Sequence, residues 1–214
     1  MRLVIDIDNT LVDYRKSIRK SLLSRNFQLD IEDDFLDIEI NKIKKIIRDQ
    51  IGDSNWQYIQ GDIYSDQSQN VNFYQNSREA LKQFIYKGYE IYLISHKTKY
   101  GIKDSKNVNI LSIAQTRIFN WIMENNLGKG IKSIIFCDSI EEKLEMIYLI
   151  HPQVIIDDLL FIHEKIQLHN IKQNKALHIL FNGKNIKNLN SSLIIERNNI
   201  IEANNWINIP NMIS

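Results

Sequence analysis

The chain has 214 residues, of which 43% are hydrophobic and 25% are charged, and its formal net charge is +1. This composition is typical of a globular protein, and the length suffices for one sizeable domain with an insert. A net charge so close to zero excludes a strong overall attraction to nucleic acid or to anionic membranes, so we expect neither as a partner. We expect a cytoplasmic protein, because no apolar run reaches the roughly 18 residues of a membrane span and acids interrupt the N-terminal apolar stretch.

The first predicted element is a buried strand near the N-terminus. Leu3, Val4 and Ile5 form its apolar run, and two acids, Asp6 and Asp8, follow with one residue between them. Side chains two positions apart in a strand point to the same side, so these charges repel each other and are costly to bury without a positive partner. Their placement favours a metal ion or a pair of acid–base groups over a structural role.

A long segment between Tyr14 and about Gln75 follows, and we expect it to form a mainly helical insert without a strand. Apolar residues repeat with a helical period in its middle, at Ile40, Ile43, Ile46, Ile47 and Ile51. Basic residues are interleaved with them, at Lys42, Lys44, Lys45 and Arg48. We interpret the basic residues as the solvent-exposed face of this helix rather than as an anion-binding surface.

Strands and helices alternate in the rest of the chain. Short runs rich in Ile, Val, Leu and Tyr predict four strands, over residues 89–95, 131–137, 153–157 and 175–181. Helical periodicity occupies residues 76–88, 110–128 and 139–152. Capping-box pairs open the first and the last of these helices, Asn76 with Glu79 and Ser139 with Glu142. The alternation predicts a doubly wound parallel α/β sheet, and the Asn-rich stretch 182–190 predicts a surface loop.

Polar side chains gather where the predicted strands end. In an open α/β sheet the functional crevice lies at the carboxyl ends of the strands, so residues that end different strands meet there. The residues concerned are Asp6, Asp8, Asn9 and Thr10 after the first strand, Ser95 and His96 at the second, and Asp157 and Asp158 at the fourth. Lys143 lies in the first turn of the helix after the third strand, so we expect it to point toward the same edge.

This order of residues resembles the four motifs of the haloacid dehalogenase superfamily. The stretch DIDNT, residues 6–10, corresponds to the first motif, Ser95 to the second and Lys143 to the third. The adjacent acids Asp157 and Asp158 correspond to the fourth. All four occur in the expected order and on the expected elements, which makes the resemblance specific.

The resemblance covers the core, roughly residues 1–13 and 76–182. The layout looks most like the phosphatases of this superfamily that carry a small helical cap between the first and second motifs. It is more loosely similar to the 5′(3′)-deoxyribonucleotidases, whose fourth motif is also an Asp-Asp pair. The resemblance implies a Rossmann-like catalytic core of residues 1–13 and 76–214 and a helical cap of residues 14–75. Only core elements lie between the second and third motifs, so the insert alone is left to cover the site.

The resemblance also implies a reaction, that of a Mg²⁺-dependent phosphohydrolase (a phosphomonoesterase) with a phospho-aspartate intermediate. Asp6 would attack the phosphorus atom of the substrate. Asp8 would protonate the leaving oxygen and then activate water for hydrolysis of the acyl-phosphate. Dehalogenases of the superfamily lack the second acid of the first motif, so the presence of Asp8 excludes dehalogenation.

The ligands of the metal and of the phosphate follow from the same resemblance. Mg²⁺ prefers oxygen ligands and would be held by the Asp6 carboxylate, the Asp8 main-chain carbonyl and the Asp158 carboxylate. Asp157 would instead orient a water or hold the loop, by alignment with the Gly-Asp form that the fourth motif takes in many relatives. The phosphate would be bound by Asn9, Thr10, Ser95, His96 and Lys143. Whether the next residue, Lys97, also touches the substrate stays open.

The substrate is left open as a small phosphorylated metabolite. The insert carries five aromatic residues, Trp56, Tyr58, Tyr64, Phe73 and Tyr74. Such rings can stack on a nucleobase, which makes a nucleotide one candidate, but we favour their packing inside the cap. A phosphotransferase or mutase with the same intermediate is one alternative, and a non-catalytic protein that binds a phosphorylated ligand or a protein partner is another. The sequence does not indicate an oligomeric state.

Overall fold

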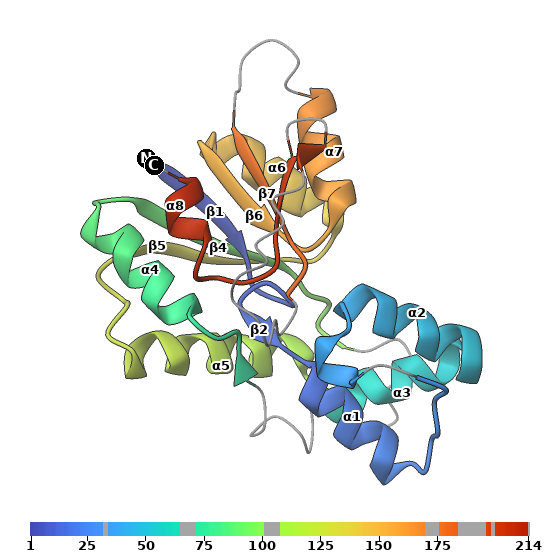
Figure 1. Ribbon diagram of the computed structural model, residues 1–214. Coiled ribbons are helices and arrows are strands. Elements are labelled where there is room, and N and C mark those ends of the chain that lie inside the picture. Colours follow the sequence, from blue (N-terminus) through green and yellow to red (C-terminus); the bar gives the residue numbers. More distant parts are fainter. Residues whose placement is uncertain are drawn as a thin grey trace.

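The computed structural model describes residues 1–31, 34–64, 72–100, 108–169, 176–183, 196–197 and 200–213. Within this part of the chain, seven strands form one sheet in the order β5-β4-β1-β6-β7-β9-β8 (Figure 1). The strands are β1 Arg2–Asp6, β4 Glu90–His96, β5 Ile131–Cys137, β6 Val154–Asp157, β7 Leu177–Phe181, β8 Glu196–Arg197 and β9 Ile200–Ala203. Neighbouring strands are parallel except for β8, which pairs antiparallel with β9.

Helices cover both faces of the sheet. They are α4 Ser77–Tyr86, α5 Ile110–Glu124, α6 Ile140–Ile150, α7 Leu160–His169 and α8 Ile209–Met212. Residues of β1 alternate between the two faces and are almost completely buried on both, because Leu3 and Ile5 belong to one apolar cluster and Val4 to another. The first cluster contains the inner sides of α4 and α5, and the second contains those of α6 and α7. The predicted doubly wound α/β fold is therefore confirmed.

The predicted strands agree closely with the observed ones. β5 has the predicted bounds, and β4, β6 and β7 differ from the prediction by one or two residues at their ends. The two strands at the far edge, β8 and β9, were not predicted. The predicted loop over residues 182–190 falls largely on residues 184–190, which lie outside the described part of the chain.

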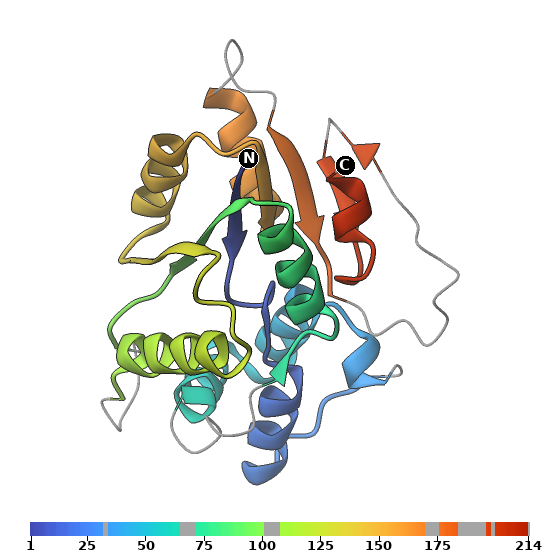
Figure 2. The same ribbon diagram turned by 90° about the vertical axis from the view of Figure 1, so that its left-hand side faces the viewer.

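The insert after β1 is helical, as predicted. It contains α1 Arg15–Ser24, a short 3-10 helix η1 Phe35–Asp37, α2 Ile40–Ile51 and α3 Asp53–Tyr64. In Figures 1 and 2 these helices, coloured blue to cyan, lie together beyond one end of the sheet. The exact boundaries at residues 14 and 75 stay a prediction.

One expectation about the insert was wrong, because a short strand does precede Gln75. β2 Val12–Asp13 pairs antiparallel with β3 Asn72–Phe73, and the two form a separate ribbon where the insert joins the core. Two residues in each strand are too few to produce an alternating pattern, so no periodicity in the sequence indicated them.

Two aromatic residues also pack differently from the expectation that they lie inside the cap. The ring of Phe73 stacks on Trp121 of α5, with 4.1 Å between the ring centroids. The ring of Tyr74 packs edge-on against Phe181 of β7 at 4.9 Å. Both residues lie in the segment that connects the end of the insert to the core, so their packing anchors that segment on the core.

A buried ion pair anchors the other end of the insert. Arg15 is 0% exposed, and its Nε and Nη2 donate to the Asp13 carboxylate at 2.9 and 2.7 Å. The same guanidinium donates to the main-chain oxygen of Leu36 and lies 5.2 Å from the ring centre of Tyr74. Arg15 therefore contacts both segments that join the insert to the core, one through Asp13 and the other through Tyr74. Through Leu36 it also contacts η1, a helix of the insert itself.

The two predicted capping boxes have different outcomes. Ser139 Oγ accepts a hydrogen bond from the Glu142 main-chain N–H at 3.1 Å, as predicted, although the Glu142 carboxylate accepts from Asp138 N–H instead of Ser139. The box at Asn76 is wrong. Asn76 has a left-handed backbone with φ of 65° and makes no side-chain capping bond, whereas capping residues usually have an extended backbone.

Candidate active site

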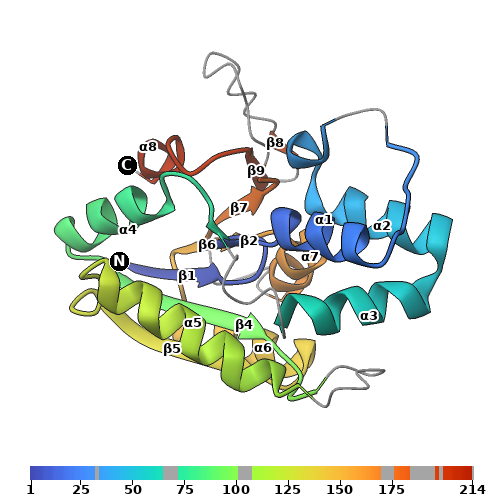
Figure 3. The same ribbon diagram turned by 90° about the horizontal axis from the view of Figure 1, so that it is seen from below.

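A cavity of about 230 Å³ lies where the carboxyl ends of β1, β4 and β6 meet the helices of the insert. Figure 3 shows β1 and β4 running toward α1 and α3, which lie beyond their ends. The predicted site residues that line the cavity are Asp6, Asp8, Asn9, Ser95, His96, Lys143 and Asp158. The convergence predicted from strand ends is therefore present, because parallel strands in register bring these distant residues to one edge.

Two of the predicted residues do not line the cavity. The Thr10 side chain is 0% exposed and its hydroxyl has no partner among the described residues. Asp157 lies behind the cavity wall, where its Oδ1 accepts from Leu159 N–H at 2.9 Å and its Oδ2 from Lys143 at 2.7 Å. Both carboxylate oxygens of Asp157 are therefore occupied by protein donors.

Lys143 joins the first and fourth motifs. It lies in the first turn of α6, is 2% exposed, and places its Nζ 2.6 Å from Asp6 Oδ1 as well as 2.7 Å from Asp157. The negative charges of the two acids hold the pKa of Lys143 above its ordinary value in spite of burial, so it stays charged. Lys143 therefore fixes one oxygen of Asp6 and leaves the other, Oδ2, without a partner in the described residues.

Three acids are close enough to hold a metal ion. Asp6, Asp157 and Asp158 each offer a carboxylate oxygen, and these oxygens lie within 4.8 Å of one another. Asp6 Oδ2 and Asp158 Oδ2 are buried and have no hydrogen-bond partner among the described residues. Burial and the neighbouring carboxylates raise the pKa of Asp6 well above its ordinary value although Lys143 opposes this, and burial raises that of Asp158 to about 7. A cluster made of carboxylate oxygens fits Mg²⁺ better than a metal that prefers nitrogen or sulfur.

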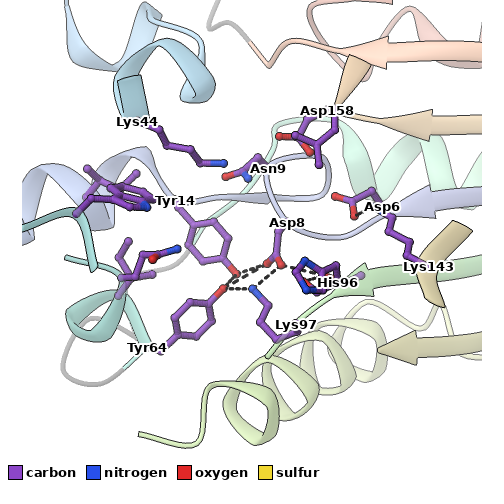
Figure 4. A pocket seen from close by; sticks show the side chains of 16 residues that line it. Asp6, Asp8, Asn9, Tyr14, Lys44, Tyr64, His96, Lys97, Lys143 and Asp158 are labelled. Atoms are coloured by element: carbon purple, nitrogen blue, oxygen red, sulfur yellow. Dashed lines mark hydrogen bonds and ion pairs between the residues drawn. The ribbon is translucent and has the colours of Figure 1, made fainter. Parts of the chain in front are cut away.

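Asp8 lies in a separate network on the other side of the cavity, as Figure 4 shows. Its carboxylate is 2.5 Å from Lys97 Nζ and accepts hydrogen bonds from Ser95 Oγ at 2.9 Å and Tyr14 Oη at 2.7 Å. Tyr64 Oη lies 3.4 Å from the same carboxylate and also contacts Lys97. Burial alone would raise the pKa of Asp8, but the charge of Lys97 and these hydrogen bonds lower it to about 2. Asp8 is therefore ionised at neutral pH in the ligand-free protein.

Several residues of this site were not identified from the sequence. Lys97 was left open, and a signal existed, because it lies two positions after Ser95 at the end of the same strand. Tyr14 and Tyr64 stand at the start of α1 and the end of α3, and no pattern in the sequence relates them to Asp8. Among the predicted cap aromatics, Trp56 also lines the cavity.

The interpretation of the basic residues of α2 was wrong at one position. Most of them are exposed, but Lys44 is half-buried and lines the cavity. Asn41, one turn earlier, donates to the main-chain oxygen of Asp158 at 3.3 Å, so this side of α2 faces the fourth motif. A helical wheel could not assign Lys44 to this side, because the docking of α2 on the core determines which flank of its polar face is covered.

Among the described residues, no helix combines the length and the apolar character that crossing a membrane requires. The sequence matches no family model, and the search of curated proteins found no match. Solved structures do match. The chain is similar to a haloacid dehalogenase superfamily hydrolase from Ehrlichia chaffeensis, with 17% identity, a TM-score of 0.51, and 99% of this chain and 95% of that chain covered.

Two further structures agree. A haloacid dehalogenase-like hydrolase from Xanthomonas campestris has 13% identity and a TM-score of 0.53, with 100% and 94% of the two chains covered. A predicted phosphoglycolate phosphatase from Haemophilus somnus has 14% identity and a TM-score of 0.50, with 99% and 97% covered. Identities this low speak for the fold alone. The chain therefore has the α/β fold of the haloacid dehalogenase-type hydrolases, which its sequence motifs predicted.

Proposed function

We propose that this protein is a Mg²⁺-dependent phosphomonoesterase that hydrolyses a small phosphorylated metabolite through a phospho-aspartate on Asp6. The observation that carries this proposal is the state of the Asp6 carboxylate. One of its oxygens is held by Lys143 at 2.6 Å, and the other has no hydrogen-bond partner among the described residues, as is also true of Asp158 Oδ2 in the same acid cluster. This arrangement is typical of a nucleophile that awaits an electrophile and a cation, and a buried structural carboxylate would have both oxygens paired.

Asp6 and Asp158 would hold Mg²⁺ through these oxygens, with the Asp8 main-chain carbonyl as the third protein ligand that the resemblance implies. Bound there, Mg²⁺ supplies positive charge that offsets the phosphoryl oxygens and the acids around them. Asp157 would act indirectly, because both its oxygens already accept from Lys143 and Leu159. It keeps Lys143 and the loop of the fourth motif in position.

The acid–base role falls to Asp8. Its carboxylate is within hydrogen-bond distance of four donors that fix its orientation, and it reaches the same cavity as Asp6. A bound phosphoester brings negative charge next to Asp8 and competes for Lys97, which raises the pKa of Asp8 toward the value that a proton donor needs. After the alcohol has left, the ionised Asp8 can accept a proton from the water that attacks the phospho-aspartate.

The phosphoryl group would be bound by the donors that line the cavity near Asp6. Lys143 provides positive charge, and Ser95, Asn9 and His96 border the same space. The small volume, about 230 Å³, is below the range of about 300 to 1,000 Å³ of typical ligand pockets. It supports a phosphoester smaller than a nucleotide, although a nucleotide remains in the panel that tests the proposal.

A panel of phosphomonoesters tests this function. Phosphate release from p-nitrophenyl phosphate, sugar phosphates and nucleoside monophosphates should require Mg²⁺ and disappear with EDTA. Asp6→Asn should abolish turnover and the acid-stable phosphoenzyme seen by mass spectrometry, whereas Asp8→Asn should reduce turnover strongly and leave Mg²⁺ binding nearly intact. Asp138→Asn, an exposed acid next to the site, is the matched control. Full activity in EDTA or in Asp6→Asn refutes the proposal, and phosphate found only on an added acceptor indicates a phosphotransferase instead.

A further inference from the structure

Among the described residues three lysines line the cavity, and two of them are already paired. Lys143 lies 2.6 Å from Asp6 and 2.7 Å from Asp157, and Lys97 lies 2.5 Å from Asp8. These ammonium groups are needed to balance the buried acids. Because these carboxylates largely neutralise their charge, Lys143 and Lys97 contribute little to the binding of any part of a substrate other than the phosphoryl group.

The third lysine, Lys44, is different. Its described contact is a 3.3 Å hydrogen bond to Asn41 Oδ1 on its own helix, and no described carboxylate lies within 4 Å of its Nζ. It is half-buried on the cavity wall, where an ammonium group without a counter-ion loses hydration and gains little in return. Figure 4 shows the side chain extending from α2 toward Asn9 and Asp158. A half-buried, unpaired cation that points into a cavity indicates an anionic ligand.

Asp158 is the first acid to consider as a charge partner of Lys44. The charge of Lys44 does act on Asp158, because it opposes the rise in the pKa of that carboxyl. However, no ion pair joins Lys44 and Asp158 among the described residues, and Asp158 Oδ2 has no hydrogen-bond partner there. A divalent cation held by Asp158 and Asp6 would offset the negative charge of the Asp158 carboxylate. Asp158 would then attract Lys44 less.

The position of Lys44 determines which part of a substrate it would meet. The acids come from the strand ends and Lys143 comes from α6 of the core. Lys44, Trp56 and Ile63 belong to α2 and α3 of the insert and form the opposite wall. A phosphoryl group at Asp6 therefore leaves the alcohol part of the substrate to face the insert. That wall offers apolar contacts from Trp56 and Ile63 and one positive charge.

We propose that Lys44 is a specificity-determining residue that binds a second anionic group, a carboxylate or a phosphate, on the alcohol part of the substrate. This inference rests on the proposed phosphomonoesterase function and narrows it to small phosphoesters with two anionic ends. The cavity volume of about 230 Å³ restricts the connection between the two ends to a few atoms.

Three non-hydrolysable phosphonates with the same two-carbon chain test the inference by calorimetry in Mg²⁺. Propylphosphonate ends in a methyl group, 3-phosphonopropionate in a carboxylate and ethane-1,2-diphosphonate in a second phosphonate. The protein should bind at least one of the two compounds that have an anionic group at each end about 10-fold more tightly than propylphosphonate. This is the effect expected of a hydrogen-bonded charge pair. The better of the two identifies the second anion.

Lys44→Met should remove this preference, because it keeps most of the length of the unbranched side chain and deletes its charge. Lys42→Met is the matched control, because Lys42 lies on the same helix and is exposed. It should bind all three compounds as the parent protein does. Equal binding of the three compounds by the parent protein overturns the inference. So does an equal loss for all three in Lys44→Met, which would assign Lys44 to the phosphoryl group.

The proposed function is checked separately by Mg²⁺-dependent hydrolysis of p-nitrophenyl phosphate, which has no second anion. If this hydrolysis is present and the phosphonates bind equally, only the inference about Lys44 fails. If no phosphoester is hydrolysed while the preference exists and depends on Lys44, the anion site stands and the catalytic function fails. The two failures are therefore distinguishable.

Discussion

Asp157 and Asp158 are adjacent in the sequence, yet replacing each of them by Asn should change the stability of the metal-free protein in opposite directions. Asp157 accepts hydrogen bonds on both oxygens, from Lys143 at 2.7 Å and Leu159 N–H at 2.9 Å. Asp158 is 6% exposed and its Oδ2 has no described partner. Asp157→Asn therefore removes a paired charge, and Asp158→Asn removes an unpaired one.

The magnitude follows from the pKa of Asp158. Burial raises this pKa to about 7, although Lys44 opposes the rise, and the difference from the ordinary 3.8 corresponds to at most roughly 4 kcal/mol. At pH 8 in EDTA the carboxylate is ionised in the fold at this cost, so Asp158→Asn should raise the free energy of unfolding by about 1 to 4 kcal/mol. Asp157→Asn should lower it by about 2 kcal/mol, because the buried Lys143 loses one of its two partners.

The pH dependence has a definite sign. Between about pH 4 and pH 7 the folded state keeps a proton on Asp158 that the unfolded chain has released, so Asp158 contributes a negative slope to the stability as the pH rises. Asp158→Asn should reduce this slope, and at pH 4 it should differ little from the parent protein. Added Mg²⁺ at pH 8 should stabilise the parent protein and Asp157→Asn more than Asp158→Asn.

Urea denaturation followed by tryptophan fluorescence, at pH 4, 6 and 8 with EDTA or Mg²⁺, measures each of these quantities. If Asp158→Asn destabilises the metal-free protein at pH 8 as much as Asp157→Asn does, the Asp158 carboxylate has a partner in the metal-free protein and the reasoning is refuted. If Asp157→Asn weakens Mg²⁺ binding more than Asp158→Asn, the assignment of Asp158 as the direct ligand is reversed.

Two further predictions concern the other buried charges. Lys97→Met removes the cation that most strongly lowers the pKa of Asp8, so the basic limb of the pH profile of kcat/KM, which reports loss of the Asp8 proton, should move up by about one pH unit or more, and an unchanged profile would remove Asp8 from the acid–base role. Arg15→Met leaves the Asp13 carboxylate buried without its partner, so the free energy of unfolding should fall by about 3 kcal/mol in urea denaturation, and a loss below about 1 kcal/mol would contradict the anchoring role.

The fold was predictable because its signals are local. The apolar runs of β4, β6 and β7 consist mainly of residues that are buried on both faces of the sheet, and the run of β5, Ile131 to Cys137, is partly buried, which nearly continuous apolar runs indicate directly. The strands of only two residues were harder to detect. β8 and the ribbon of β2 and β3 contain two residues per strand, and the pairing partner, which lies far away in the sequence, decides whether so short a stretch is a strand.

The residues at the strand ends were predictable for a related reason. Asp6, Ser95 and Asp158 stand at or next to the ends of strands, and the rule that parallel strands present their carboxyl ends at one edge places them together without coordinates. The same rule reaches Lys143 through the helix that follows β5.

No such rule predicts which residues form the opposite wall of the cavity, because the docking of the helical insert on the core depends on many contacts between segments far apart in the sequence. That docking gives Lys44 its place on the cavity wall instead of in solvent, and it brings Tyr14 and Tyr64 to Asp8. The sequence by itself thus determined the sheet and the acids at its edge, since their positions follow from local periodicity and strand direction. Only the tertiary structure decided which side chains of the insert face those acids, since that choice is made by packing between surfaces and not by the pattern of any one segment.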